Sequence, residues 1–161
     1  MNRRDVLKTA PAAAAAAGLA GCSSVPFLGG GCSAPSGSPS EVLPSGGDSF
    51  TQESATSGSS GIQLDGLQGQ AQGVYADGDG NTLTIAVFEF ESSDSASGAA
   101  ELLRQAAENS DTQSAAAGGL LQTGSWLVTV GGPSESKVRS LVAASAFGDG
   151  CTGEVEFVTS G

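Results

Sequence analysis

The sequence predicts an α+β fold: a small antiparallel or mixed sheet with two helices on one face, following a disordered N-terminal tether. A run rich in β-branched and aromatic residues, Leu83 to Phe90, follows a turn of Gly, Asp and Asn and reads as a strand. An alanine stripe at helical spacing comes next. Strand and helix patterns then alternate to Gly161, which favours a ferredoxin-like or related open sandwich.

The predicted domain, residues 62–161, opens with a hairpin. Residues 63–76 are expected to be extended, and Asp77-Gly78-Asp79-Gly80-Asn81 forms the turn because Gly and Asn tolerate positive φ. The second strand is apolar on both faces, with Leu83, Ile85 and Val87 on one and Ala86, Phe88 and Phe90 on the other. Such a strand is usually central or covered on both sides.

Two helices and further strands complete the prediction. Ser92-Ser93-Asp94 supplies cap residues for a helix. Its apolar stripe consists of Ala96, Ala99, Ala100, Leu103, Ala106 and Ala107. Residues 109–119 are expected to form a loop, and residues 120–130 a strand or a hairpin folded at Thr123-Gly124.

Pro133 is well placed to open the second helix, whose apolar face is Val138, Leu141 and Val142. Val155 and Phe157 then alternate with Glu154 and Glu156, which is typical of an edge strand with one wet face. The alternative is a small β-rich domain in which one of the helices fails to form.

Residues 22–61 are predicted to be a tether that starts at Cys22. Of the 39 residues from 23 to 61, 24 are Ser, Gly or Pro. Such a stretch buries too little apolar surface to offset its ordering entropy, so we expect it to stay flexible. Val25-Pro26-Phe27-Leu28 and Val42-Leu43 are small apolar islands within it.

Residues 1–21 have the pattern of an export signal. Arg3, Arg4 and Lys8 form a basic end, an alanine-rich apolar run follows, and small residues precede Cys22. The apolar run is shorter than the roughly 20 residues that a membrane-spanning helix needs. The paired arginines indicate the twin-arginine route, which exports folded proteins.

Leu19-Ala20-Gly21-Cys22 resembles a lipobox, the cleavage motif of lipoproteins. Together with Arg3-Arg4 and the acidic composition, it makes the chain similar to the twin-arginine-exported lipoproteins of halophilic archaea. The resemblance covers about the first 24 residues and the bulk composition, and it implies no activity. It implies that Cys22 carries a lipid after passage through the export machinery. The expected location is therefore the extracytoplasmic face of the cell membrane.

The charge of the chain excludes some partners. Without residues 1–21, 16 acidic residues stand against Arg104, Lys137 and Arg139, a formal charge of −13. Such a surface repels phosphate backbones, so we expect no nucleic-acid partner. It keeps a protein soluble at high salt, where the Debye length is about 3 Å at 1 M.

The sequence offers few candidates for catalytic or metal-binding residues. The chain has no histidine, which removes histidine-dependent catalysis and metal binding, and it lacks a phosphate-binding loop. Asp77, Asp79 and Asn81 are a weak cation candidate because Thr82 and Phe88 replace the Gly and Glu of a calcium loop. Glu154 and Glu156 could cluster with Glu89 or Glu91 if their strands pair. We predict no catalytic residue and no cofactor.

Cys32 and Cys151 remain once Cys22 carries its lipid, and outside the cell such a pair forms a disulfide or stays as two free thiols. Trp126 and Tyr75 are expected in the core, since aromatic residues on apolar strand faces are mostly buried.

Three classes of function remain open. A binding module for an unknown surface ligand or protein, our first choice, predicts an apolar pocket near Trp126 or Phe88. A structural envelope protein predicts an exposed apolar patch or sheet edge and no pocket. A carboxylate-dependent enzyme predicts two acids about 5 to 10 Å apart in a cleft.

Overall fold

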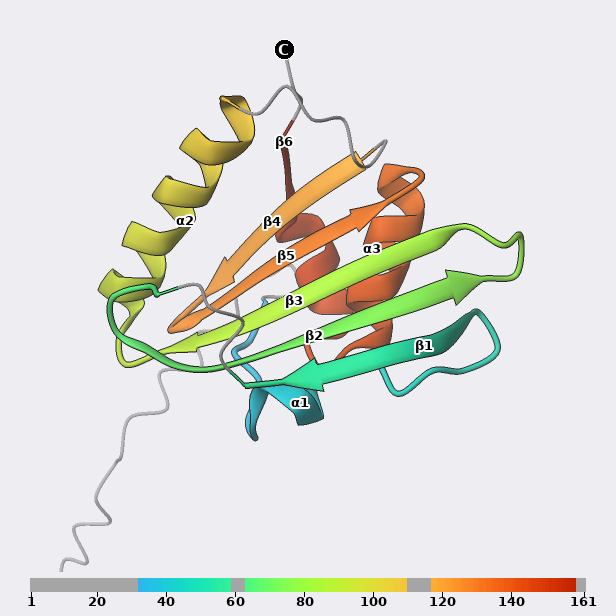
Figure 1. Ribbon diagram of the computed structural model, residues 1–161, viewed down its shortest axis with the longest axis horizontal. Coiled ribbons are helices and arrows are strands. Elements are labelled where there is room, and N and C mark those ends of the chain that lie inside the picture. Colours follow the sequence, from blue (N-terminus) through green and yellow to red (C-terminus); the bar gives the residue numbers. More distant parts are fainter. Residues whose placement is uncertain (1–31, 59–62, 110–116, 159–161) are drawn as a thin grey trace, which may run out of the picture.

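The strands form one antiparallel sheet, and helices cover it from both sides (Figure 1). The computed structural model describes residues 32–58, 63–109 and 117–158. The strand order is β1-β2-β3-β5-β4-β6, and every neighbouring pair is antiparallel. The elements are α1 (Pro39–Val42), β1 (Phe50–Ser57), β2 (Leu67–Asp77), β3 (Thr82–Phe90), α2 (Ser93–Glu108), β4 (Ala117–Thr123), β5 (Trp126–Gly132), α3 (Glu135–Ala144), the 3₁₀ helix η1 (Asp149–Glu154) and β6 (Glu156–Val158).

One side of the sheet, here called the α3 face, holds the larger core. Leu83, Ile85 and Val87 of β3 point to it and are fully buried. The same cluster includes Leu121 of β4 and Val128 of β5. It is closed by α3, by α1 and the segment after it, and by η1, through Val138, Leu141, Val142, Val42, Leu43, Phe50, Phe147, Cys151 and Val155.

The opposite side, here called the α2 face, holds a smaller core. Phe88 and Phe90 of β3 pack there against the alanine stripe of α2, together with Leu120 and Leu127. Leu120 and Leu121 are adjacent in β4 yet belong to different clusters, because successive strand residues point to opposite faces.

The α+β class and the open sheet are thus confirmed, but the predicted placement of both helices on one face is wrong. In Figure 1, α2 lies in front of the sheet and α3 behind it. The physical reason is that β3, β4 and β5 are apolar on both faces, so each face needs a cover. The strand order also departs from a ferredoxin-like arrangement, because the last strand, β6, pairs with β4 at the sheet edge and not with β3.

Local sequence patterns predicted the correct helices and strands in the second half of the chain. Ser92 caps α2 through its hydroxyl oxygen, which accepts from the Ser95 amide at 3.2 Å. The β4–β5 hairpin turns at Gly124, whose φ is 56°. However, α3 begins at Glu135 with Ser134 as its cap, so Pro133 precedes the helix rather than opening it.

The prediction of a flexible tether is wrong for residues 32–58, the part of the tether that the structure describes. Residues 32–58 belong to the domain, with α1 and the edge strand β1 among them. Val42 and Phe50 are buried, and the buried Tyr75 hydroxyl donates to the Pro44 carbonyl at 2.5 Å. The Ser, Gly and Pro content of this segment did not indicate that it is folded. A few apolar residues, although separated by Ser and Gly, are enough to pack the segment against the core of the domain. Arg3, Arg4 and Cys22 lie outside the described residues.

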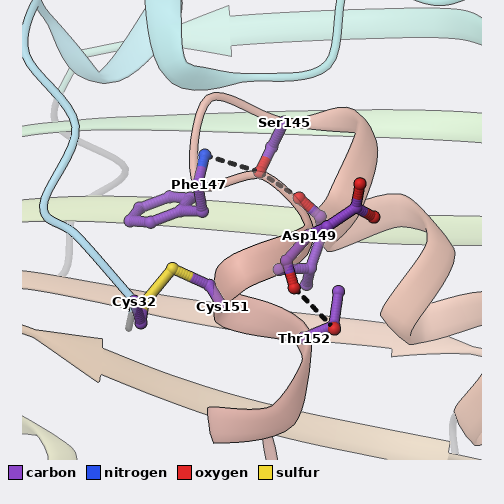
Figure 2. Close-up of a disulfide and its surroundings, with 7 residues drawn as sticks. Cys32, Ser145, Phe147, Asp149, Cys151 and Thr152 are labelled. Carbon is purple, nitrogen blue, oxygen red and sulfur yellow. Dashed lines mark hydrogen bonds between the residues drawn. A yellow bond between two sulfur atoms is a disulfide. The ribbon is translucent and has the colours of Figure 1, made fainter. Parts of the chain in front are cut away.

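A disulfide fixes the start of this segment to the end of the domain. Cys32 is bonded to Cys151, 119 residues further along, with the Cα atoms 4.2 Å apart. Figure 2 shows Cys151 in η1, next to the loop in which the Ser145 hydroxyl oxygen accepts from the Phe147 amide at 3.3 Å. Cys151 is fully buried. Of the two alternatives that the sequence leaves open for these cysteines, the structure has the disulfide.

Replacing Cys32 and Cys151 together with alanine should lower the free energy of unfolding by about 2–5 kcal/mol, because the bond restricts the unfolded chain over a long loop. Guanidinium chloride denaturation, with and without a thiol reductant, measures this. The reductant should destabilise the native protein and leave the double variant unchanged. An equal response of both proteins would contradict the assignment.

Candidate functional site

A groove crosses the part of the α2 face that α2 leaves open. Helix α2 packs mainly over β3, β4 and β5 and also contacts β6, while β1 and β2 lie beyond it (Figure 1). The groove has a volume of about 480 Å³ and runs over β1, β2, β3 and β5. Leu103 of α2 forms part of its wall. This volume lies within the range of about 300–1,000 Å³ that is common for ligand pockets.

The sheet register sets the order of the side chains in the groove. Thr56, Gln72, Ala86 and Thr129 are successive partners across β1, β2, β3 and β5, so they form one row perpendicular to the strands. Neighbouring strands lie about 4.8 Å apart. Small Ala86 stands in the row between Gln72 and Thr129, which leaves space between the two polar side chains.

Every residue that lines the groove is uncharged. Its polar side chains are Thr56, Ser57, Gln70, Gln72, Thr84 and Thr129. Phe88 and Leu103 supply apolar surface. The groove can therefore bind by hydrogen bonds and apolar contact, and it offers no counter-charge to an ion.

The aromatic residues singled out in the sequence lie in the core. Trp126 is 4% exposed and meets Phe147 edge to face, with ring centroids 6.3 Å apart. Tyr75 is fully buried and lies on the α3 face, where burial raises the pKa of its phenol. Of the two residues near which a pocket was expected, Phe88 lines the groove and Trp126 does not.

The acidic turn between β2 and β3 is held by its own hydrogen bonds. The Asp77 carboxylate accepts from the backbone amides of Asp79 and Asn81 at 2.9 and 2.8 Å. It also accepts from the Asn81 side-chain amide. These bonds, led by the one from the Asn81 side chain, hold the pKa of Asp77 well below its usual range, together with a nearby lysine.

That lysine is Lys137 on α3. Its ammonium lies 3.0 Å from Asp77 and 3.3 Å from Asp79, and its hydrogen bond to Asp77 raises its pKa. The weak cation candidate at Asp77, Asp79 and Asn81 is thus a hairpin turn joined to α3 by a side-chain cation. Over the residues that the structure describes, no group of three or more acidic, Cys or His side chains could hold a metal ion.

The condition for a carboxylate cluster of Glu154 and Glu156 with Glu89 or Glu91 is not met, because their strands do not pair. Strand β6 pairs with β4 at the sheet edge, far from β3 in the strand order. Glu156 instead pairs with Arg104 of α2, with 2.9 Å between the closest charged atoms. The edge position of β6, with exposed Glu156, is as predicted.

The third cation of the domain also joins two elements. Arg139 of α3 donates to the Thr152 carbonyl of η1, and its guanidinium carbon lies 4.8 Å from the ring centroid of Phe157. Arg104, Lys137 and Arg139 are the only basic residues after Lys8. Each of these three side chains therefore links two secondary-structure elements and stabilises the fold.

A pocket near Phe88 was predicted from the sequence, but the polar side chains of β1, β2, β3 and β5 that line the groove were missed. Their signal was present in the alternation of Gln70, Gln72 and Val74 with Ala71 and Tyr75 along β2, which marks a face less apolar than its opposite. What the sequence could not show is that α2 stops short of this part of the sheet.

Searches of family models, curated proteins and solved structures returned no match to this chain.

The Asp77–Lys137 contact predicts a pH effect. The folded-state pKa of Asp77 is depressed, so its contribution to stability is present above the unfolded value, about 3.9, and is lost as the pH falls toward the folded value. Asp77→Asn keeps an oxygen acceptor for the turn amides but removes the charge. Thermal unfolding should therefore show a melting temperature several degrees below that of the native protein at pH 7, with a smaller difference near pH 2.

Asp77→Ala is the companion variant, since it removes the turn acceptor as well as the charge and should unfold at a lower temperature than Asp77→Asn. The pKa of Glu41 is also lowered, by hydrogen bonds from Ser38, but this group is the same in all three proteins. A constant difference between native protein and Asp77→Asn from pH 7 to pH 2 would refute the assignment.

Proposed function

We propose that this protein is a membrane-anchored, extracytoplasmic lipoprotein whose small acidic domain binds a ligand in the groove on the α2 face. The observation that carries the binding role is the groove itself, which combines apolar surface from Phe88 and Leu103 with hydrogen-bonding side chains. The anchor rests on the resemblance of residues 19–22 to a lipobox and on Arg3-Arg4.

We further propose that the protein is not an enzyme. No residue lining the groove has an acidic or basic side chain. General acid–base catalysis and attack by an activated nucleophile both need a group that exchanges a proton near neutral pH. A carboxylate mechanism would need acids in the cleft, and the acids of the described domain lie outside it.

The proposed anchor and the disulfide together limit where the domain sits. Nine residues lie between Cys22 and Cys32, and the ten residue-to-residue steps span at most about 36 Å when the chain is fully extended. Cys32 packs on the α3 face, whereas the groove lies on the α2 face. A lipid on Cys22 would thus keep Cys32 within about 36 Å of the membrane surface, with the attachment point on the side opposite the groove.

A structural envelope role is the competing proposal, and the sheet edge offers some support for it. Strand β1 is an edge strand that is exposed along all but its first residue. However, its register shifts between Gln52 and Ser54, which leaves the charged Glu53 at a bulge. Bulges and charges at an edge oppose pairing with another strand.

Within the described residues, no helix is long and apolar enough to span a bilayer.

Intact mass and membrane partitioning of the native protein against Cys22→Ser test the anchor. The native protein should begin at residue 22, carry the mass of a lipid and separate with the membrane fraction. Cys22→Ser should lack the lipid mass. Ser24→Ala is the matched control, because it changes a residue close to Cys22, leaves the Cys32–Cys151 disulfide intact and should keep the lipid. Identical masses and partitioning of the native protein and Cys22→Ser would refute the proposal.

A further inference from the structure

The charge distribution of the domain points to a class of ligand. Acidic residues outnumber basic ones 16 to 3 after residue 21. The net field therefore repels anions, while the three cations that could attract an anion are engaged with Asp77, Asp79, Glu101, Glu156, Thr152 and Phe157. The groove has no carboxylate to pair with a cation. An ion that entered it would lose water without gaining a partner, which is costly.

Four of the polar side chains of the groove are available for a ligand, whereas Gln70 donates to the Gly58 carbonyl at 2.6 Å. Thr56, Gln72, Thr84 and Thr129 make no side-chain hydrogen bond to any residue in the described ranges, and each is exposed or half-buried. Many other polar side chains of the domain are engaged, as Gln52 is with Tyr75 and Gln122 with Ser97. The row Thr56–Gln72–Ala86–Thr129 thus presents donors and acceptors that point away from the sheet.

The types of these side chains favour amide groups. A glutamine amide both donates and accepts, so Gln72 can satisfy the N–H and the C=O of one peptide group, and a threonine hydroxyl can do either. Sugar rings usually pack on an exposed aromatic face. In the described part of the chain the aromatic side chains are buried, apart from Phe157, which lies under Arg139. The apolar surface of Phe88 and Leu103 fits an aliphatic side chain instead.

We propose that the groove binds an uncharged peptide segment. Amide groups of the segment bond to Gln72 and Thr129, and an aliphatic side chain packs against Phe88 and Leu103. This inference rests on the proposed binding function and adds the chemistry of the ligand.

The test uses three small leucine probes, of which one is neutral with two amide groups and two are charged with one amide group each. N-acetyl-leucine N′-methylamide is neutral, N-acetyl-leucine is an anion, and leucine N-methylamide is a cation at neutral pH. Each is titrated at millimolar concentration into the isotope-labelled full chain carrying Cys22→Ser, and amide chemical shifts are followed by NMR. A fourth probe, methyl glucoside, represents a neutral sugar.

The neutral amide should produce saturable shifts at Gln72, Ala86 and Thr129. The two charged probes should bind at least about ten-fold more weakly, because neither finds a counter-charge in the groove and each has one amide group fewer to bond there. Gln72→Ala should weaken the neutral probe by about three- to ten-fold, the cost of a lost hydrogen bond. Gln68→Ala is the matched control, since Gln68 is an exposed glutamine of the same strand outside the groove lining, and it should leave binding unchanged.

Other outcomes overturn the inference in distinguishable ways. Equal binding of neutral and charged amides in the groove, or binding of the sugar alone, would refute the peptide ligand and leave the binding function standing. Saturable shifts outside the groove, or no saturable shift with any of the four probes, would refute the groove as the binding site. The spectrum of Gln72→Ala without probe shows whether the variant is folded.

Discussion

The burial of the α3 face of the central strands is the interaction on which the rest of the structure depends. Five residues of the central strands, Leu83, Ile85, Val87, Leu121 and Val128, are fully buried there. Full burial of such a side chain contributes about 1.5–3 kcal/mol. One helix is too narrow to cover six strands, so α1, η1 and the segment around Phe50 complete the cover. The Cys32–Cys151 bond then ties the first described residue to η1.

The open groove follows from this arrangement. Because the α3 face recruits the N-terminal segment as well as α3 and η1, α2 remains as the cover of the other face. Its alanine stripe allows a close approach to Phe88 and Leu127, but the helix lies over one half of the sheet. The three cations hold the parts together, with Arg104 joining α2 to β6, Lys137 joining α3 to the β2–β3 turn and Arg139 joining α3 to η1. The exposed half of the α2 face thus stays uncharged in a strongly acidic domain.

Local patterns in the sequence predicted most of the elements, because caps, turns and alternation act over a few residues. The Ser92 cap, the Gly124 turn and the two-sided β3 strand were all recognisable. The prediction that both helices lie on one face was wrong, although the apolar residues on both faces of β3 already indicated a cover on each side. The prediction for the N-terminal segment was wrong because Val42, Pro44 and Phe50 are buried in a core formed by residues far along the chain, which a local pattern does not reveal. The groove depends on how far α2 extends over the sheet, which no local pattern contains.

The most direct test of this account is a methyl NOESY spectrum of the protein in solution, read at two neighbouring leucines. The account predicts contacts from the Leu120 methyls to Ala99 or Ala100 of α2, and from the Leu121 methyls to Leu141 or Val138 of α3. It also predicts no contact between α2 and α3, and no covering side chain over the Thr84 and Thr129 methyls. Contacts of both leucines with one helix, or between the two helices, would contradict it, and the groove with it.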